Sequence, residues 1–427
     1  MRIAITTFGT EGDIRPFIAL TRRLCQAGHD AWLVAPPLYV QRAAENGVPL
    51  RAAGRSWSET ELRQAMAAVM HEKHPLRQAG LIFESLADRL IAALPDVIQA
   101  TRPADVIIHH QIDVTGFAAA EVHRKPRITG HLFHGSLRAC GIAPDGRNFG
   151  ALGNRLMTHL LRFLMSRFAD APFNRVLAAA GLKPRRPLWA AMSESPLLNL
   201  LAISPALVPP DPLWCEQRVV QTGYWFLDTP TYNPPRALTE FMAAGEPPVV
   251  VTFGSMVSPD ARAQTDAVVG ALTRLGRRAI LQAGWNPLGQ THLPPNFLRV
   301  DYVPHDWLFP RAACVVHHGG AGTTAAVTRA GVPHMVVHHL ADQPYWAQLL
   351  YQQGLAARPL HHRQLTAERL FDHLATVVDN AGMQGRARAL GQRVQAEDGL
   401  SQAVAAIEFA VRMRGLRTGD ARAYAQA

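Results

Sequence analysis

The stretch Cys314–Trp346, CVVHHGGAGTTAAVTRAGVPHMVVHHLADQPYW, decides the fold of this chain. It starts as a short apolar strand, turns through a glycine-rich loop, and enters a helix that we expect to open at Thr323 and Thr324 and to stop at Gly331. A strand, a loop almost without side chains and a helix N-terminus leave backbone N–H groups unpaired, with the positive end of the helix dipole behind them. The stretch therefore predicts a seat for a phosphate or diphosphate.

The residues around this turn exclude two common phosphate loops. A P-loop needs a lysine before its Ser or Thr, whereas Gly322 is followed directly by Thr323. A dinucleotide fingerprint needs Gly-x-Gly-x-x-Gly and an acidic residue after the next strand, which here leads into two histidines and then Asp342-Gln343. His318 before the turn and the Asp-Gln pair after the following strand favour a diphosphate contact with a polyhydroxylated group beside it.

Strand-like and helical segments alternate along the chain, which predicts an α/β protein built from two doubly wound units. With 427 residues the chain is too long for one ordinary core and suits two domains. A proline-rich segment at 227–248 is typical of a linker, so we expect domains at 1–226 and 249–427.

The first unit places a candidate functional loop at the end of its first strand. Ile3–Thr6 is a β-branched strand, and we expect a helix after it with Pro16 in its first turn. Asp13 lies at the mouth of the connecting loop, where open α/β sheets bind ligands. In the second unit we expect the last strand at Leu355–Arg358.

The composition is that of a basic globular protein, with 48% hydrophobic residues, 18% charged residues and a formal net charge of +10. The charge favours anionic partners, but the arginines are spread through helices without interleaved aromatics, so we expect a solvated basic surface and no nucleic acid. The four cysteines are widely scattered, which argues for a reducing, cytoplasmic setting. We expect no signal peptide and no spanning helix. A monomer or a homodimer is expected.

Residues 154–168 form an amphipathic and basic segment. Three interpretations stay open for it. Such a helix most often packs on its own domain. It is also typical of a weak contact with a membrane surface, or of a helix that closes over an apolar ligand.

Adjacent histidines occur at 109–110, 317–318, 338–339 and 361–362. Neighbouring strand residues point to opposite faces, so such pairs are poor metal ligands, and no carboxylate pair with metal spacing accompanies them. We expect no metal ion, with a histidine and a helix dipole stabilising the phosphate instead.

Four spaced blocks carry a resemblance to a known family: PHDWLFP at 304–310, HHGGAGTT at 317–324, AGVP at 330–333 and DQPYW at 342–346. In this order they resemble the family 1 nucleotide-sugar glycosyltransferases of the GT-B fold, in the sterol glucosyltransferase-like branch and the bacterial natural-product branch related to the vancomycin enzymes. GTEGDIRPF at 9–17 and Gly254-Ser255 extend the resemblance more weakly. It implies two Rossmann-like domains facing a central cleft, with the last helix, within 384–414, crossing back to the first domain.

The resemblance also implies the donor site. Ser255, His318, Gly320, Gly322 and Thr323 would hold the diphosphate, Asp342 and Gln343 the sugar, and Trp285, Val303 and His305 the nucleobase. Plainer roles stay open for several of them. Thr323 could be a helix N-cap, Trp285 a core residue, and Asp342-Gln343 a cap before Pro344. His317, on the other side of the strand from His318, is expected to be buried.

The resemblance further implies that Asp13 is the general base, because a carboxylate there can accept the proton of a hydroxyl if its pKa is raised. Asp13 could instead be the N-cap of the following helix, and Asp342 is an alternative base. From topology we expect His109 or Asp113 to orient Asp13. The expected acceptor pocket comprises Glu11, His109, Asp113 and His134.

These expectations combine into an inverting, metal-independent glycosyltransferase without a cofactor. UDP-glucose would be the favoured donor, with a dTDP-sugar as the alternative, and the acceptor would be a hydroxyl of an apolar natural product such as a polyketide, terpenoid, sterol or flavonoid. His318, Thr323 and the helix N-terminus would receive the leaving charge. A nucleotide-sugar epimerase or hydrolase, or a non-catalytic nucleotide-sugar binding protein, are the alternatives. A nicotinamide dehydrogenase is disfavoured, because GTEGD lacks the fingerprint.

Overall fold

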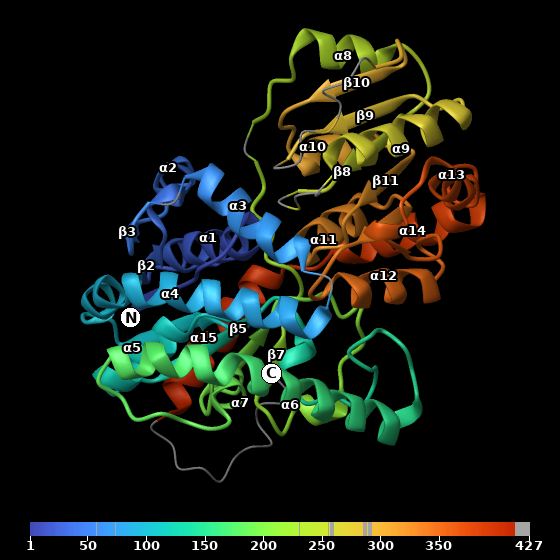
Figure 1. Cartoon of the computed structure of the whole chain (residues 1–427). Coiled ribbons are helices and arrows are strands. Elements are labelled where there is room, and N and C mark those ends of the chain that lie inside the picture. The colour runs from blue at the N-terminus through green and yellow to red at the C-terminus, as the bar shows by residue number, and fades with distance from the viewer. Residues whose placement is uncertain are drawn as a thin grey trace.

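The computed structural model describes residues 1–414, apart from Trp57, Lys73, Pro230, Ser255 and residues 257–259, 285–287 and 289–292. Within these residues the strands form two parallel sheets, one in each half of the chain (Figure 1). The expected α/β architecture of two doubly wound units is therefore confirmed.

The N-terminal sheet has the strand order β3-β2-β1-β4-β5-β6-β7. Its central strands are buried along almost their whole length, as is typical of parallel strands covered by helices on both faces. The strand order reverses between β1 and β4, so the loops that follow these two strands diverge and leave a crevice. The strands are β1 (Arg2–Thr6), β2 (Asp30–Ala35), β3 (Leu50–Ala52), β4 (Val106–His110), β5 (Arg127–His131), β6 (Leu198–Leu201) and β7 (Val219–Gln221).

The C-terminal sheet has the order β10-β9-β8-β11-β12-β13 and reverses between β8 and β11. The strand expected at Leu355–Arg358 is wrong: only an isolated bridge between Ala356 and His334 forms there, and the strand follows Pro359. Proline has no N–H to donate, so the ladder starts after it. The strands are β8 (Val249–Thr252), β9 (Ala279–Gln282), β10 (Phe297–Val300), β11 (Cys314–His317), β12 (His334–His338) and β13 (Leu360–His361).

Helices cover the sheet of each half (Figure 1). In the N-terminal half they are α1 (Glu11–Gln26), α2 (Val40–Glu45), α3 (Glu59–His71), α4 (Pro75–Thr101), α5 (Val114–His123), α6 (Gly150–Ala179) and α7 (Leu188–Ser193). In the C-terminal half they are α8 (Arg236–Ala243), α9 (Ala261–Arg274), α10 (His305–Leu308), α11 (Ala321–Ala330), α12 (Gln343–Gln352), α13 (Ala367–Ala375), α14 (Ala381–Gln395) and α15 (Gly399–Met413).

Part of the segment expected as a linker is folded. α8 lies inside 227–248, and its Leu238 is buried in the core of the C-terminal half. Upstream, Trp225 and Leu227 belong to the core of the N-terminal half, so the chain changes halves between Leu227 and α8.

The last helix crosses back to the first domain, as expected. α15 packs on α1, and Ala403, Val404 and Ile407 are buried in the core of the N-terminal half. Arg23 on α1 donates a hydrogen bond of 2.7 Å to Ser401 Oγ. The neighbouring α14 packs on α11 instead, so the crossing begins only after it.

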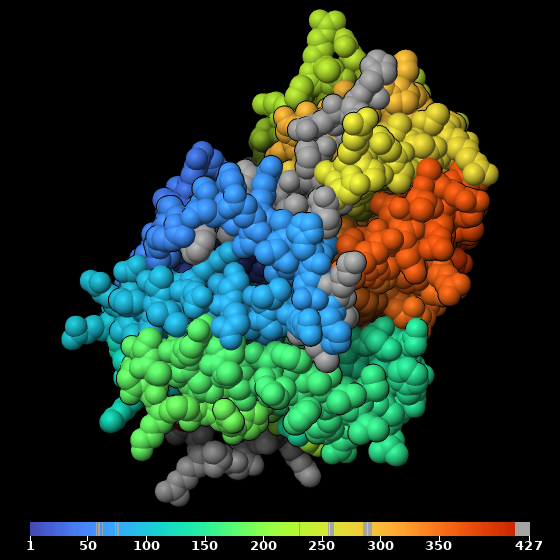
Figure 2. Space-filling view, viewed as in Figure 1, coloured from blue at the N-terminus to red at the C-terminus, as the bar shows by residue number. Residues whose placement is uncertain are grey.

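A second junction closes the cleft from one side, where α3 lies against the C-terminal half. Arg363 Nη2 donates to the carbonyl oxygen of Glu72 at 2.8 Å, and Met66 packs against the C-terminal core. Figure 2 shows this blue segment directly beside the orange C-terminal surface. Among the described residues no helix is both long and apolar enough to cross a membrane.

Candidate active site

The glycine-rich turn after β11 leads into α11 at the crevice of the C-terminal sheet. α11 begins at Ala321 with Gly320 as its N-cap, so Thr323 is the third helical residue and not the cap. Its N-cap is a glycine and supplies no side-chain cap, and its first turn holds no acidic residue. The carboxylate of Asp342 on the neighbouring loop interacts with the backbone of Ala321, which opposes the rise in the pKa of Asp342. Backbone N–H groups and the positive end of the dipole therefore face the cleft. The helix ends as expected, at Gly331 with φ of 70°.

His318 lies beside this turn, between the glycines of two loops. A Cβ at Gly320 would overlap its Nε2, and a Cβ at Gly254 would lie 3.0 Å from its Cε1. Only residues without a side chain leave room for the ring here. Burial lowers the pKa of His318 to about 4, so the ring is neutral at pH 7, and its Nδ1 has no partner among the described residues. A neutral imidazole at a helix N-terminus can donate a hydrogen bond to an anion.

His317 serves the fold instead, and its expected burial is confirmed. Its Nδ1 accepts a hydrogen bond of 3.1 Å from the Gly319 N–H, and its Nε2 lies 3.0 Å from His334 Nδ1. The other nitrogen of His334 lies 3.5 Å from Thr328 Oγ1 on α11. This chain of neutral rings joins the glycine turn to β12 and α11, and so fixes the turn.

Asp13 lies in the first turn of α1, which begins at Glu11 with Thr10 as its N-cap. The expectation that Pro16 lies in the first turn is therefore wrong, because Pro16 lies in the second turn. The alternative role of Asp13 as the N-cap is excluded. The Asp13 carboxylate accepts hydrogen bonds from the Thr10 N–H at 2.8 Å and from the Thr10 hydroxyl at 3.2 Å. The Thr-x-x-Asp pattern of a capping box, and not the proline, sets the start of the helix.

Asp13 is half-buried and lines the cleft. Desolvation raises its pKa to about 6, and the hydrogen bonds from Thr10 oppose this rise. Gly9 leaves the space for the carboxylate, because a Cβ there would overlap Asp13 Oδ2. A carboxylate whose pKa is near 6 suits a general base at neutral pH.

The N-termini of α1 and α11 face each other across the cleft. A Cβ at Gly322 would lie 4.0 Å from the Cα of Gly12. Beside them, desolvation raises the pKa of Asp342 to about 6, and the charge of Asp13 adds to this rise. Trp346 Nε1 holds the Asp342 carboxylate at 2.6 Å. The structure thus brings a carboxylate from each domain to the anion seat.

Gln343 is buried, lines the cleft, and braces the loop that carries Asp342. Its Oε1 accepts hydrogen bonds from the N–H groups of His339 at 2.7 Å and Leu340 at 3.1 Å. Its Nε2 lies 3.3 Å from Met256 Sδ. Ala341, which lies between Leu340 and Asp342 in this loop, has a φ of 56°, a left-handed conformation that is strained for a residue with a side chain.

Of the residues expected to contact the nucleobase, the structure places one in the cleft. His305 lines the cleft, stacks on Phe309 with ring centroids 4.2 Å apart, and has its pKa lowered to about 3, mainly by burial. Val303 is buried and does not line the cleft. Ser255 and Trp285 lie outside the described residues.

Sequence reasoning missed Arg15, which lines the same part of the cleft. It donates hydrogen bonds to Tyr302 Oη at 3.1 Å and to the Leu227 carbonyl at 3.0 Å. The residue lies one turn into α1 from Glu11, so its position on the cleft face of that helix was the available signal.

The cleft holds a cavity of about 1590 Å³ between the two halves. Of the expected acceptor residues, Glu11 lines it and lies 3.5 Å from Arg42 in an ion pair. His109, Asp113 and His134 do not line it.

Each of these three is buried in another role. His109 Nε2 lies 3.2 Å from Thr129 Oγ1 on the other face of the sheet, and burial holds its pKa well below the usual value. Asp113 caps α5 and accepts from the Thr115 N–H at 2.9 Å, so neither residue orients Asp13. His134 is enclosed by aromatic rings, with the Tyr345 centroid 4.7 Å away.

The residues that do line the acceptor side are His110 and the apolar faces of two helices. The error at His109 is one of alternation, because a shift of one residue along a strand changes the face. The cavity wall from α4 and α6 is formed by Ala79, Ile82, Phe83, Leu86, Met157, Leu160, Leu161, Leu164 and Met165.

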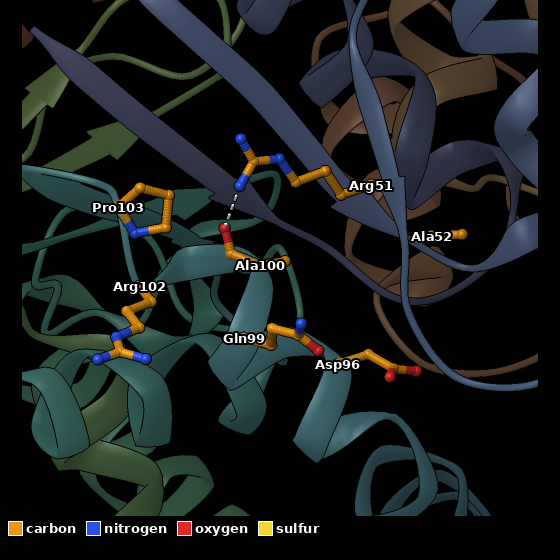
Figure 3. Close-up of a pocket in the computed structure, with 7 residues that line it drawn as sticks. All are labelled: Arg51, Ala52, Asp96, Gln99, Ala100, Arg102 and Pro103. Carbon is orange, nitrogen blue, oxygen red and sulfur yellow. Dashed lines mark hydrogen bonds between the residues drawn. The ribbon is translucent and has the colours of Figure 1, made fainter.

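A second depression, of about 750 Å³, lies beside β3 and the end of α4 (Figure 3). Arg51 crosses it and donates a hydrogen bond of 2.9 Å to the carbonyl oxygen of Ala100. It shares no lining residue with the cleft among the described residues, and its walls carry both signs of charge. Also within the described residues, no group of three or more His, Cys, Asp or Glu side chains is arranged to hold a metal ion.

The fold and the site define the class of protein: two doubly wound domains enclose a cleft with an anion seat on one side and an apolar cavity on the other. Solved structures share this fold. The glycosyltransferase of kitacinnamycin matches with a TM-score of 0.69 at 18% identity, over 96% of this chain and 98% of that one. The glycosyltransferase VinC in complex with dTDP matches with a TM-score of 0.68 at 20% identity, over 96% and 100%.

Sequence relatives give the family. The O-mycaminosyltylonolide 6-deoxyallosyltransferase of Streptomyces fradiae is 32% identical over 422 residues, which span 96% of this chain and 97% of that protein. The sterol 3-beta-glucosyltransferase of Saccharomyces cerevisiae (strain YJM789) is 29% identical over 95% of this chain and 35% of its own length. Residues 267–408 match the erythromycin biosynthesis protein CIII-like C-terminal domain. The chain belongs to this family of GT-B glycosyltransferases, and the resemblance seen in the sequence is confirmed.

Proposed function

We propose that this glycosyltransferase is inverting and metal-independent, and that it transfers a sugar from UDP-glucose or a dTDP-sugar to a hydroxyl of an apolar natural product. The observation that carries the proposal is the meeting of the two helix N-termini, where the Asp13 carboxylate of one domain faces the N-terminus of α11, with its glycine N-cap, in the other. A base and an anion seat at this junction flank the place where a sugar is transferred.

The base in this proposal is Asp13. Its raised pKa allows it to take the proton of the acceptor hydroxyl, while Thr10 fixes the direction of the carboxylate. The acceptor oxygen then forms a bond to the anomeric carbon on the face opposite the diphosphate. The bond between that carbon and the diphosphate oxygen breaks, and the leaving group takes the electron pair, so the configuration inverts.

The leaving diphosphate is received by neutral His318, by Gly320, Gly322 and Thr323, and by the dipole of α11. These groups stabilise charge that grows in the transition state and need little reorganisation. We include Ser255 from the neighbouring loop in this seat on the strength of the family resemblance alone. Donors of this kind supply the charge stabilisation for which other transferases use a metal ion, which supports a reaction without one.

The donor sugar would contact Asp342, whose carboxylate lies at the same junction, with Gln343 holding the loop beneath it. The nucleobase would lie toward His305, with Trp285 and Val303 beside it by family resemblance. The relative from Streptomyces fradiae carries a deoxyallosyl name and VinC was solved with dTDP, which supports a dTDP-sugar. The sterol glucosyltransferase relative supports UDP-glucose.

The acceptor is apolar in this proposal because α4 and α6 line the cavity with aliphatic, aromatic and methionine side chains. Such a wall binds by burying apolar area and leaves orientation to a few polar groups. The polar residues His110, Gln111 and Ser136 line the same cavity from outside these two helices.

Thermal unfolding with UDP, dTDP or NAD, each with EDTA, tests the donor site. We expect UDP or dTDP to raise the midpoint, with about 2.7 kcal/mol of stabilisation at 100 times the dissociation constant. His318→Ala should abolish this rise. A rise with NAD alone would overturn the proposal.

Turnover of UDP-glucose and a dTDP-deoxysugar with a macrolide aglycone, followed by mass spectrometry and NMR, tests the reaction. A glycoside of inverted anomeric configuration is expected. Free sugar without a glycoside would favour a hydrolase, an isomerised donor an epimerase, and binding without turnover a non-catalytic protein.

A further inference from the structure

The first half of α6 has two apolar faces: one lines the central cavity, and the other is exposed on the outer surface. Leu152 is 83% exposed, Leu156 68% and Phe163 66%, and Phe149 and Leu160 are also exposed. Their spacing of three and four residues places all five along one side of the helix. We call these five residues the α6 stripe. Figure 2 shows this teal-green segment on the outer surface, and in Figure 1 α6 runs below α4.

Basic residues border the α6 stripe. Arg155 and His159 lie along one edge and Arg167 beyond its end, and all three are exposed. From Gly146 to Ala169 the chain contains no acidic residue, and the whole chain carries a formal charge of +10. Exposed apolar side chains edged by arginine are the pattern of a helix that lies in the plane of a membrane interface.

The opposite face of the same segment forms part of the wall of the central cavity, through Met157, Leu161 and Leu164. Leu160 belongs to both faces, because it lines the cavity and is also exposed. The apolar surface is therefore continuous from the outside of the protein to the cavity. Asn154 fixes the start of the helix, since it donates to the Cys140 carbonyl at 3.0 Å and accepts from the Phe149 N–H at 2.8 Å.

We propose that the α6 stripe docks the protein on an anionic lipid surface, with Leu160 at the point where an apolar molecule passes from the lipid into the cavity. Apolar side chains enter the acyl boundary while the arginines contact anionic headgroups. A second copy of the chain fits less well, because two such stripes in contact would bring their like-charged borders together. The passage of an acceptor rests on the proposed function, whereas the docking itself does not.

Vesicle flotation without nucleotide or acceptor tests the docking. The wild-type protein is mixed with vesicles of phosphatidylcholine alone, or with added phosphatidylglycerol, at low and high salt. We expect it to float with the anionic vesicles, less so at high salt, and weakly with the neutral ones. The variant L152S/L156S/F163S should bind at least about tenfold more weakly, because it removes the side chains that enter the lipid.

A matched control keeps the number of substitutions and moves them elsewhere. The variant L38S/V40S/V122S changes three other exposed apolar residues and should float like the wild type. The variant R155Q/R167Q should lose the preference for anionic vesicles and keep the weak neutral binding. Thermal unfolding of each variant checks that it is folded. We expect all of them to fold, because the substituted side chains are exposed.

Several outcomes would overturn the docking proposal: a wild-type protein that stays with the vesicle-free fractions, a stripe variant that floats as well as wild type, or a control that loses as much. Sedimentation velocity identifies the rival occupant. If the stripe variant turns a dimer into a monomer and the wild type ignores vesicles, the surface joins two copies. Glycoside formation in detergent is measured separately, so transfer and docking can fail independently.

Discussion

The two helix N-termini that meet in the cleft have similar backbone surroundings but differ in the charge of their first turns. α1 and α11 each follow a central strand at the point where the strand order of the sheet reverses, and each has glycine as its second residue, Gly12 and Gly322. These glycines let the two helices approach each other closely.

The first turns differ in charge. α1 has Glu11 and Asp13 there, and Asp13 reaches back to Thr10, whereas α11 has Gly320 as N-cap and Thr323 in the place of Asp13. Carboxylates in the first turn neutralise a helix N-terminus, while a first turn without them attracts anions. The same strand–loop–helix unit thus makes a base on one side and an anion seat on the other, and the residue at the third helical position decides which.

Removing the carboxylate from α1 should give the largest effect. In Asp13→Asn we expect turnover to fall by about 10² to 10⁴, the usual contribution of a general base, because the amide cannot accept the hydroxyl proton. Binding of the nucleotide should stay within about twofold, since the α11 seat is untouched. Steady-state kinetics and calorimetric titration measure the two. Equal losses in both would show that Asp13 holds the donor instead.

The pH dependence sharpens this test. Because the pKa of Asp13 is raised to about 6, kcat/KM of the wild type should rise with pH through about 6 and then level off, with Asp342 titrating in the same range.

The raised pKa of Asp13 also affects stability. It lowers the free energy of unfolding as pH rises from 3.8 to about 6, because the folded state binds the proton more tightly than the unfolded one. Asp13→Asn should therefore stabilise the protein at pH 8, by about 1 to 2 kcal/mol, measured by urea unfolding at pH 4 and pH 8.

Giving α11 the carboxylate of α1 should have the second largest effect. In Thr323→Asp we expect nucleotide affinity to fall by about 10² to 10³, because a donor hydroxyl is replaced by a negative charge beside the diphosphate. The free protein should be as stable as wild type, since an acidic residue in the first turn favours a helix by about 0.3 to 1 kcal/mol. Thr323→Ser, which keeps the hydroxyl, is the control. Unchanged affinity in Thr323→Asp would remove α11 from the anion seat.

Displacing the Asp13 carboxylate without removing it should give a smaller loss. In Gly9→Ala the new Cβ would overlap Asp13 Oδ2, so we expect turnover to fall by about tenfold to a hundredfold, as for other small misplacements of a catalytic group. The double variant G9A/D13N should be no slower than Asp13→Asn alone, because both changes act on one group. Additive losses in the double variant would mean that Gly9 acts elsewhere.

The smallest effect is expected beside Asp342. Ala341 adopts a left-handed conformation that glycine takes without strain. Ala341→Gly should raise the free energy of unfolding by about 0.5 kcal/mol, because relief of strain exceeds the added chain entropy. Thermal unfolding measures it, with Gly385→Ala in α14 as a control that should stabilise through helix propensity. A clear loss of stability in Ala341→Gly would show that the Ala341 side chain contributes packing.

The donor side could be predicted from the sequence because local signals set it. The strand, the glycine turn and the stop at Gly331 follow from residues close together in the chain, and the loop at the end of a parallel strand needs no knowledge of packing. The helix after the glycine turn begins at Ala321, two residues before the expected start at Thr323. The N-cap roles left open for Thr323 and, in the other half, for Asp13 are wrong, because each residue lies third in its helix. The Thr-x-x-Asp signal was present for α1.

The acceptor side could not be predicted in the same way. His109 and His110 are adjacent, and which of them faces the cavity depends on the position of β4 between its neighbours, which a single strand does not encode. The apolar residues of α4 and α6 follow the same sequence pattern as those of a core-facing helix, because a cavity wall and a core have the same composition. Only the packed structure separates them.

The crossing of α15 has a consequence for the order in which the chain completes itself. The N-terminal core includes residues of the last helix, and more than 170 residues lie between Leu227 and Gly399. This core therefore stays incomplete until the chain of the other domain has been made. An exchange of domains with a relative would have to move α15 together with the N-terminal half. A junction placed in the linker alone would pair α1 with a foreign helix.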